Sequence, residues 1–337
     1  MPKPRALLSN VLLALCGVVA TLLIAEGLAG LLWQAPWHER LLLEQGESQE
    51  FSYRRNSFGL RGDEPEVPKP LGTQRVLFTG DSFTFGLGVK DDSDTFPTVL
   101  EQQLADEQQL AGEPRAVDIV NGGISGSLTG DWGALWRRTG EALDPDVVIA
   151  VFFLRDGTRL ATIPDFFGQI REEIARHNEG STLYRYSHLY RRIRDYQDRF
   201  RVGEIYTESL VNAYLGEDTT EWQRAKRNLV SLRNMVQEHG AVFGLAVFPV
   251  LVELGPDYPF SGIVDELMGF ARRNDIPAHD LLPAFLGLDG PSLWVSALDQ
   301  HPNPRGHAIA AESLLPFVRA LLEQSEAKKA AFSPARR

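Results

Sequence analysis

The feature that most constrains the fold of this chain is a regular alternation of short apolar runs with longer amphipathic stretches. Residues 147–153 read Val-Val-Ile-Ala-Val-Phe-Phe, and such an uninterrupted apolar run is typical of a strand covered on both faces of a parallel sheet. Further buried strands are predicted at 75–79, 116–120 and 241–248. Because helices are predicted between them, the pattern indicates a doubly wound α/β fold with a parallel sheet of about five strands.

Amphipathic helices are predicted between these strands and after the last of them. Their ranges are 95–110, 132–143, 221–239, 262–274 and 304–322. Residues 156–216 do not fit the alternation, because they are far longer than an ordinary connection between a strand and a helix. We predict that this insertion has structure of its own or is partly mobile. Since it leaves the end of a strand, it should lie near the carboxyl edge of the sheet.

The N-terminus carries an apolar stretch, residues 6–33, which follows the positive charges of Lys3 and Arg5. The stretch is long enough to cross the hydrocarbon core of a membrane, which takes about 20 residues. A mostly acidic segment follows it, so the positive-inside rule places the bulk of the chain outside the cytoplasm. We therefore predict a single-pass membrane anchor, with Trp33 and Trp37 at its outer surface.

Two other interpretations of this stretch are a cleaved signal peptide and a lipoprotein signal that ends at Cys16. The apolar run is longer than a signal peptide needs, and no small-x-small cleavage site follows it. The bulky Leu15 directly before Cys16 argues against a lipoprotein signal. A retained anchor is therefore favoured. Within the stretch, Glu26 is either a functional group or a residue hydrated near the outer headgroups, and the second interpretation is favoured.

Composition and local patterns limit the remaining organisation. The net charge of −11 argues against sequence-independent binding of nucleic acid, which needs clustered Lys and Arg. A single cysteine excludes an intrachain disulfide and a cysteine-based metal cluster. The proline-rich residues 63–70 predict an extended, poorly packed connector. The predicted parts are an anchor (1–33), a connector (34–72), an α/β domain (73–325) that contains the insertion, and a basic tail (326–337).

A Gly80-Asp81-Ser82 motif directly follows the first predicted strand. In open α/β sheets, ligands bind at the carboxyl ends of the strands, so the Ser82 hydroxyl is expected to face a pocket. Glycine before it permits a tight turn. Serine becomes a nucleophile only when a base takes its proton. The motif also occurs in ordinary turns and helix caps, so it needs a partner elsewhere in the chain.

The candidate base is His301, in the loop just before the last predicted helix. Asp299 lies two residues earlier, close enough to accept a hydrogen bond from Nδ1 of the imidazole and leave Nε2 for the serine. Pro302 and Pro304 stiffen this loop. The alternative is that His301 is an ordinary surface residue and that Asp299 caps the helix.

A glycine-rich loop, residues 121–126, follows the second predicted strand. Its sequence is Asn-Gly-Gly-Ile-Ser-Gly, and it reaches the same edge of the sheet as Ser82. Backbone N–H groups in such a loop can stabilise the oxyanion that forms during acyl transfer. The alternative is a tight turn with no chemical role.

Taken together, these motifs resemble the SGNH/GDSL hydrolase superfamily, in its membrane-anchored, exported bacterial form. The resemblance covers about residues 75–322 and implies a flavodoxin-like three-layer α/β/α fold. It implies that Ser82 is the nucleophile and that Asp299 and His301 are its partners. It also implies that Ser82 and Gly126 donate backbone N–H groups to the oxyanion hole. The Asp–His spacing is one residue shorter than is usual in the family.

One block departs from the family pattern. The family has Gly-x-Asn-Asp after the third strand, and its asparagine donates to the oxyanion. Here the run is Phe153-Leu-Arg-Asp156, so Arg155 stands in the place of the asparagine. A guanidinium can still donate, and it adds a full charge. The other options are that Arg155 binds an acidic group of the substrate, or that it pairs with Asp156 and leaves the oxyanion hole.

Three further features can be interpreted either as structural or as functional. Asp91, Asp92 and Asp94 are expected to form a solvated turn rather than a calcium site, because their spacing matches no known loop. His307 is expected to pack or cap within the last helix. The insertion is rich in arginine. These side chains would either bind anionic lipid or an acidic polysaccharide, or form a solvated helix face. These arginines are Arg191, Arg192, Arg194, Arg199 and Arg201.

The resemblance implies a serine esterase that acts on acyl esters, in particular O-acetyl esters, of an extracytoplasmic glycan or lipid. An O-acyltransferase on a cell-surface polysaccharide and a non-catalytic glycan-binding module are the alternatives. No cofactor and no metal is expected, and nucleic acid is not an expected partner. The expected partners are the acylated substrate and the membrane, while the sequence gives no indication of oligomeric state.

Overall fold

A computed structural model of the chain describes residues 4–32, 53–111, 116–158, 174, 176, 178, 180–296 and 299–332. The chain forms two compact units. The first comprises Met1–Leu43 and Ile163–Tyr206, and the second comprises Glu44–Thr162 and Thr207–Arg337. The second unit contains the sheet and all of the predicted site residues.

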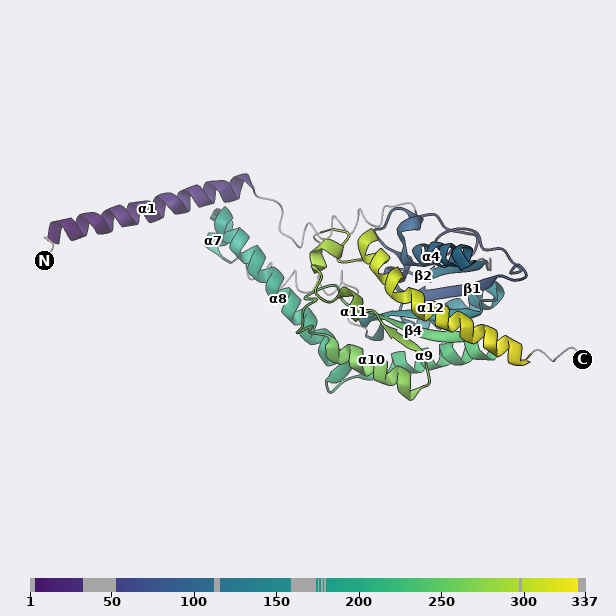
Figure 1. Ribbon diagram of the computed structural model, residues 1–337. Helices are drawn as coiled ribbons and strands as arrows, with labels where there is room; N and C mark the ends of the chain where they lie inside the picture. The colour runs from purple at the N-terminus through teal and green to yellow at the C-terminus, as the bar shows by residue number, and fades with distance from the viewer. Residues whose placement is uncertain are drawn as a thin grey trace, which may run out of the picture. The chain divides into compact units, whose positions relative to one another are not determined.

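The second unit is built on a five-stranded sheet in which every pairing is parallel (Figure 1). The strand order is β2-β1-β3-β4-β5. This is the flavodoxin-like order, so the predicted fold and the predicted number of strands are confirmed. The strands are β1 (Gln74–Gly80), β2 (Val117–Gly123), β3 (Val147–Phe153), β4 (Val242–Phe248) and β5 (Ala278–Asp280).

Helices cover both faces of the sheet. On one face lie α4 (Phe96–Ala111) and α12 (Pro304–Phe332), and on the other lie α5 (Thr129–Leu135), α9 (Thr220–Glu238) and α10 (Ser261–Arg273). This division follows from right-handed crossovers, because the chain runs one way across the sheet from β1 to β2 and the other way from β3 to β5. The strands β1, β3 and β4 form the middle of the sheet and are buried along nearly their whole length.

Some elements differ from their predicted ranges. β5 was not predicted, because three residues at the sheet edge are too few to show a period. The helix α5 begins at Thr129, earlier than predicted, and continues as a π-helical turn over Trp136–Gly140. The helix α12 runs to Phe332, so part of the predicted tail is helical. Its last ten residues are mostly Glu, Gln, Lys and Ala, which favour helix.

The connector also differs from its prediction. Residues 63–70 are mostly exposed, as expected, but Leu60 and Arg61 are almost completely buried against the second unit. An isolated bridge joins Arg61 to Asn121 of β2. The segment around Arg61 is therefore a packed part of the α/β domain rather than a loose connector.

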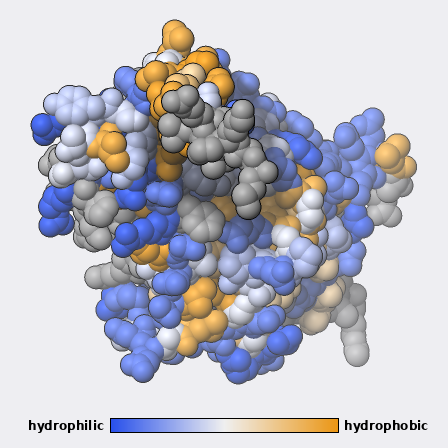
Figure 2. Space-filling model, turned by 90° about the vertical axis from the view of Figure 1, so that its left-hand side faces the viewer, coloured by the Kyte–Doolittle hydropathy of each residue, from blue (hydrophilic) through white to orange (hydrophobic). Residues whose placement is uncertain are grey.

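The first unit contains α1 (Pro4–Leu31), α7 (Thr182–Tyr186) and the first part of α8 (His188–Leu215). Within α1, residues Ser9–Leu31 have a mean hydropathy of 2.4, and most of them are exposed. Apolar side chains of α1 lie on the surface (Figure 2). The helix is long and apolar enough to cross a membrane, a property that signal sequences share. Trp33 and Trp37 lie outside the described residues.

Glu26 is engaged by protein groups rather than hydrated alone. Its carboxylate accepts hydrogen bonds from the Ser187 hydroxyl at 2.6 Å and from the Leu189 N–H at 3.1 Å, and also from the His188 N–H. Glu26 thus satisfies N–H groups at the start of α8, which have no partner inside that helix. The favoured interpretation of a merely hydrated residue is replaced by this contact.

The last part of the insertion packs on the second unit. Leu210 and Tyr214 of α8 are buried. The Tyr214 hydroxyl donates to the carbonyl of Leu154, just beyond β3, and its ring lies 5.1 Å from that of Trp222. Residues 207–215 therefore lie beside the carboxyl end of β3, as predicted for the insertion. Residues 159–173 lie outside the described part of the chain, and residues 174–206 belong to the first unit.

The carboxyl of Glu101 provides a test of how the helix α4 packs on the strand β2. It accepts a hydrogen bond from the Ile119 N–H at 3.3 Å, and burial raises its pKa from 4.5 to about 7. A raised folded-state pKa means that stability is lost as pH rises from about 4.5 to about 7. Glu101→Gln should therefore unfold at a higher temperature than the wild type near pH 8, and this gain should shrink near pH 5. An equal difference at both pH values in thermal unfolding would contradict the assignment.

Candidate active site

Ser82 is held at the carboxyl end of β1 by the geometry on both sides of it. The short helix α3 (Ser82–Phe85) begins directly after the strand, and Asp81 caps it by accepting the Phe83 N–H at 2.8 Å. A Cβ on Gly80 would lie 2.1 Å from Thr84 Oγ1 and 2.7 Å from the Val151 carbonyl oxygen, so only glycine fits there. The predicted position of Ser82 just beyond the first strand is observed.

Aromatic packing also holds the helix α3 against the ends of the neighbouring strands. The ring of Phe83 stacks on Phe153 at the end of β3 with a centroid distance of 3.9 Å, and it meets Phe248 at the end of β4 at 5.2 Å. Phe83 also lies 5.4 Å from the imidazole of His301. The ends of three neighbouring strands and the histidine loop are thus joined through one side chain.

The loop that carries His301 is held by its own hydrogen bonds. The Val295 N–H donates to the His301 carbonyl at 2.9 Å, and the Asp299 N–H donates to the Ser296 hydroxyl at 3.0 Å. The side chain of Asn303 donates to the Trp294 carbonyl at 3.0 Å. These bonds fix the direction in which the imidazole leaves the loop.

Ser82, His301 and Asp299 form one hydrogen-bonded chain. The Ser82 Oγ lies 2.9 Å from His301 Nε2, and His301 Nδ1 lies 2.5 Å from Asp299 Oδ1. Since Nδ1 faces a carboxylate, it carries the proton, and Nε2 offers a lone pair to the serine hydroxyl. Ser82 and Asp299 are almost completely buried, which strengthens these electrostatic contacts. The three residues predicted from distant parts of the sequence are therefore brought together.

Gly126 lies in a tight turn beside the same strand end. The Ser127 N–H donates to the Ile124 carbonyl at 3.0 Å, and Gly126 has a φ of +77°, which favours glycine at this position of the turn. The Ile124 N–H and the Ser127 hydroxyl both donate to the Gly80 carbonyl, at 2.9 and 3.0 Å. The turn is thus tied to the residue that precedes the nucleophile motif.

Arg155 lies beside the nucleophile motif and is largely buried. It follows β3 on a short 3₁₀-helix, and its Nη2 lies 3.5 Å from Asp81 Oδ2. The same Asp81 oxygen lies 3.4 Å from the Ser82 Oγ. The salt bridge of Arg155 is therefore with Asp81, and not with the neighbouring Asp156 as one of the predicted options had it. Its buried Nε has no hydrogen-bond partner among the described residues.

The buried carboxyl of Asp156 completes a small charge cluster. It accepts the Phe153 N–H at 2.9 Å through Oδ2, while its buried Oδ1 has no partner among the described residues. Burial and the nearby Asp81 carboxylate raise the pKa of Asp156 well above its usual value, and Arg155 opposes this only in part. Burial raises the pKa of Asp81 as well, and the Arg155 guanidinium opposes that shift.

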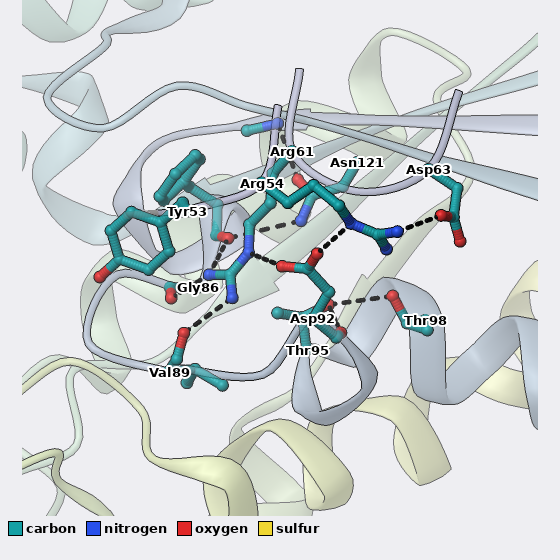
Figure 3. A network of polar contacts seen from close by, with 12 residues as sticks. Tyr53, Arg54, Arg61, Asp63, Gly86, Val89, Asp92, Thr95, Thr98 and Asn121 are labelled. Carbon is teal, nitrogen blue, oxygen red and sulfur yellow. Dashed lines mark hydrogen bonds and ion pairs between the residues drawn. The ribbon is translucent and has the colours of Figure 1, made fainter. Parts of the chain in front are cut away.

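His307 and Asp92 have structural roles. His307 is fully buried, stacks on Phe96 and accepts its N–H at Nδ1 at 3.2 Å, and burial lowers its pKa to about 3. The predicted packing role of His307 is thus observed. Asp92 is not a solvated turn residue, because Arg54 and Arg61 both pair with it (Figure 3). The described residues contain no cluster of side chains suited to a metal ion.

Sequence reasoning missed Arg61 and the turn that carries it. The available signal was the run Asn56-Ser-Phe-Gly-Leu-Arg-Gly62, in which asparagine and glycine mark a tight turn within the supposed connector. Nothing in such a turn signal indicates that the following arginine reaches a loop 25 residues further along the chain.

A parallel α/β sheet with a hydrogen-bonded serine, histidine and aspartate at its carboxyl edge has the arrangement found in serine hydrolases. Residues 78–309 match the GDSL-like Lipase/Acylhydrolase family. The match spans well over half of the chain, which therefore belongs to this family, and the resemblance seen in the motifs is confirmed. No curated protein sequence matches the chain.

Three solved structures are similar to this chain over most of the α/β domain. The structure titled TesA is 18% identical, with a TM-score of 0.46, covering 74% of this chain and 99% of that one. A catalytic mutant of an acetylxylan esterase from Geobacillus stearothermophilus is 20% identical, with a TM-score of 0.44, covering 72% and 93%. A two-domain esterase active on acetylated mannans is 14% identical, with a TM-score of 0.43, covering 75% and 50%.

Proposed function

We propose that this chain is a serine esterase in which Ser82 forms an acyl-enzyme with the acyl group of its substrate. The observation that carries the proposal is the continuous hydrogen-bonded chain from Ser82 through His301 to Asp299, with distances of 2.9 and 2.5 Å. Membership of the acylhydrolase family supports it. Serine alone is a weak nucleophile, and this arrangement supplies both the base and the group that orients the base.

The proposed reaction has two halves. In the first, Ser82 Oγ attacks the ester carbonyl carbon while His301 Nε2 takes the hydroxyl proton, and the histidine then gives that proton to the departing alcohol. In the second, water attacks the acyl-enzyme, His301 takes a proton from the water, and the proton returns to Ser82 as the carboxylic acid leaves. Asp299 holds the imidazole through Nδ1 and stabilises its charged form in both halves.

We propose that the oxyanion is stabilised by the N–H groups of Ser82 and Gly126 and by the guanidinium of Arg155. Arg155 takes the place of the family's asparagine and lies beside Asp81, which itself lies 3.4 Å from the Ser82 hydroxyl. A buried carboxylate this close to the nucleophile would oppose a developing oxyanion. A guanidinium at the same place offsets that charge and offers further N–H donors.

The proposed substrate is an acyl ester, in particular an O-acetyl ester, of a glycan or lipid on the extracytoplasmic side of a membrane. This rests on the proposed placement of the domain outside the cytoplasm. Transfer of the acyl group to a sugar hydroxyl would use the same acyl-enzyme. An assay of acyl-enzyme decay with and without a carbohydrate acceptor therefore separates hydrolysis from transfer.

We further propose that α1 is retained as a membrane anchor. The Glu26 carboxylate meets the start of α8, and the Arg192 guanidinium donates to the Leu32 carbonyl at 3.2 Å, at the end of the same apolar helix. Cleavage after α1 would remove both partners from a segment more than 150 residues away. A cleaved signal peptide has no need of such contacts, so they favour a retained helix. The charges around the apolar stretch support a catalytic domain on the extracytoplasmic side of a bacterial inner membrane.

The roles of the three residues can be tested in the full chain in detergent. Ser82→Ala and His301→Ala should remove nearly all hydrolysis of p-nitrophenyl acetate, because nucleophile and base act as a unit. Asp299→Asn should cost less, since that side chain orients and stabilises the base. His239→Ala, on the opposite edge of the sheet, is the matched histidine control and should keep wild-type activity. Substantial turnover by Ser82→Ala on the natural substrate would falsify the mechanism.

The role of Arg155 gives a second test. If Arg155 is the third oxyanion donor, Arg155→Ala should lower kcat by about 10²–10³ with little change in KM, as when another such donor is removed. Arg155→Asn, which restores the family's residue, should recover part of this loss. A penalty that falls on KM and vanishes for small neutral esters would instead mean that Arg155 binds the substrate. Thermal unfolding of each variant separates these effects from loss of fold.

The anchor proposal is tested with Glu26→Ala, which removes the acceptor for the first N–H groups of α8. Hydrogen exchange at His188 and Leu189 should become faster in detergent micelles, because the N–H groups of these two residues lose their partner. Thr21→Ala, which removes only a local contact to the Gly17 carbonyl, should leave exchange there unchanged. A mature chain whose intact mass lacks α1, or full release from membranes by high salt without detergent, would refute the anchor.

A further inference from the structure

Residues 53–62, here called the strap, fold back on themselves before the chain enters β1. The Asn56 N–H donates to the Leu60 carbonyl at 2.9 Å, and the Gly62 N–H donates to the Arg54 carbonyl at 3.2 Å. The Asn56 side chain accepts from the Leu60 N–H at 3.1 Å. The strap is thus a closed turn with defined geometry, and its last residues bridge to Asn121 at the end of β2.

Arg61 carries the contact between the strap and the loop that follows Ser82 along the chain (Figure 3). Its side chain is buried, and its guanidinium donates to the carbonyls of Gly86 at 2.6 Å, Val89 at 2.7 Å and Phe85 at 3.1 Å. Its Nε donates to Asp92 Oδ1 at 2.7 Å. One rigid fork therefore holds three carbonyls of the loop that follows the nucleophile, while Asp92 balances its charge.

The loop that Arg61 holds, residues 86–89, directly follows the helix α3, and Ser82 is the first residue of that helix. The helix α3 has only four residues, Ser82–Phe85, and the N–H groups of Gly86 and Leu87 both return to the Ser82 carbonyl. A single turn of helix is not stable alone, because nucleation costs more than one turn of hydrogen bonds returns. Its position depends on partners at its two ends, Asp81 at the start and Arg61 at the finish, where exposed carbonyls favour a cation.

Tyr53 adds a second contact to the same loop. Its hydroxyl accepts the Gly88 N–H at 2.8 Å, and its ring packs edge-on against Phe85 with a centroid distance of 4.9 Å. The guanidinium of Arg61 lies over this ring at 4.6 Å. Burial raises the pKa of Tyr53, and the negative charge of Asp299 adds to that effect, so the tyrosine lies within electrostatic reach of the proposed triad.

The loop at residues 86–89 is confined on its other side by the histidine loop. A Cβ on Gly88 would lie 2.6 Å from the nearest Val295 methyl, and the Val295 N–H donates to the His301 carbonyl. The strap therefore contacts a loop that lies between two parts of the site. Ser82 precedes this loop in the chain, and Val295 of the histidine loop packs against its other side. A shift of this loop would change the distance between Ser82 and His301.

We propose that two strap residues, Arg61 and Tyr53, hold the loop that follows the nucleophile, and that Arg61 is a positioning residue that sets the Ser82 hydroxyl against His301. The proposal rests on the proposed acyl-enzyme function. The family match covers residues 78–309, so the strap lies outside it. The proposal gives this segment a role in the rate of acylation. Asp92 supports Arg61, and Tyr53 fixes Gly88. In the sequence, the strap lies between the proposed anchor and β1.

The test compares four variants of the full chain in detergent: Arg61→Met, Arg61→Lys, Asp92→Asn and Arg54→Met. Arg54 is the matched control, because it pairs with the same Asp92 but is exposed and contacts no carbonyl of the nucleophile loop. Two readouts are taken for each variant. One is the rate constant for labelling of Ser82 by a p-nitrophenyl phosphonate, per folded molecule, and the other is hydrogen exchange in peptides that cover residues 82–89.

Arg61→Met is expected to lower the labelling rate by about 10- to 100-fold, the size expected when a reacting group moves by about 1 Å. Its kcat on p-nitrophenyl acetate should fall in parallel with little change in KM, and exchange at residues 82–89 should rise by about tenfold or more. Arg61→Lys should be intermediate, because a single ammonium cannot reach all three carbonyls. Asp92→Asn should show a smaller loss, and Arg54→Met should match the wild type.

A lower melting temperature with an unchanged labelling rate of the folded molecules would overturn the proposal, since that is the behaviour of a residue that only stabilises. If Arg61→Met does not fold, Tyr53→Phe decides instead. It keeps the ring but removes the hydroxyl that accepts the Gly88 N–H, so labelling should fall several-fold, and unchanged labelling would overturn the proposal. A wild-type chain that is not labelled at Ser82 contradicts the esterase function, while the exchange data still decide whether the strap orders the loop.

Discussion

The candidate site depends on the hydrogen bonds that fix the four-residue helix α3 at the end of β1. The sheet alone delivers Ser82 to the correct edge, but it does not set the direction of the hydroxyl. That direction comes from Asp81 at the start of the helix and from Arg61 at its end. Gly80 permits the arrangement, because any side chain there would collide with Thr84 and with β3. The geometry of the nucleophile is thus imposed by neighbours on both sides.

Charge balance explains how an arginine can stand where the family has an asparagine. The site buries two carboxyls, Asp81 and Asp156, next to a single guanidinium. Two buried carboxylates and one cation would leave an uncompensated negative charge beside the nucleophile, which is costly at low dielectric. Burial raises the pKa of both carboxyls and so lowers the cost of placing them together. The Arg155 guanidinium, 3.5 Å from Asp81, offsets negative charge beside Ser82.

The sequence predicted the sheet, and it singled out Ser82, Asp299 and His301, which the structure brings together, because both have local signals. Short, mainly apolar runs marked four of the five strands. Parallel strands bring their carboxyl ends to one edge, so Ser82 and residues 121–126 were expected to meet. His301 and Asp299 were recognised by their spacing and by the family pattern. The three-residue β5 and the π-helical turn after α5 lack such periods, and their extents came only from the structure.

The errors share a different cause. Glu26, Asp92 and Arg61 were each assigned to solvent or to a loose connector, and each has a charged or polar partner far away in the sequence. Composition and periodicity report which residues avoid water, but they do not report which charge finds a distant partner. The cost of burying an unpaired charge makes such pairings obligatory once a segment packs. A charged residue within a turn-forming run, such as the one that ends at Arg61, therefore has to be examined for a buried partner before it is assigned to the surface.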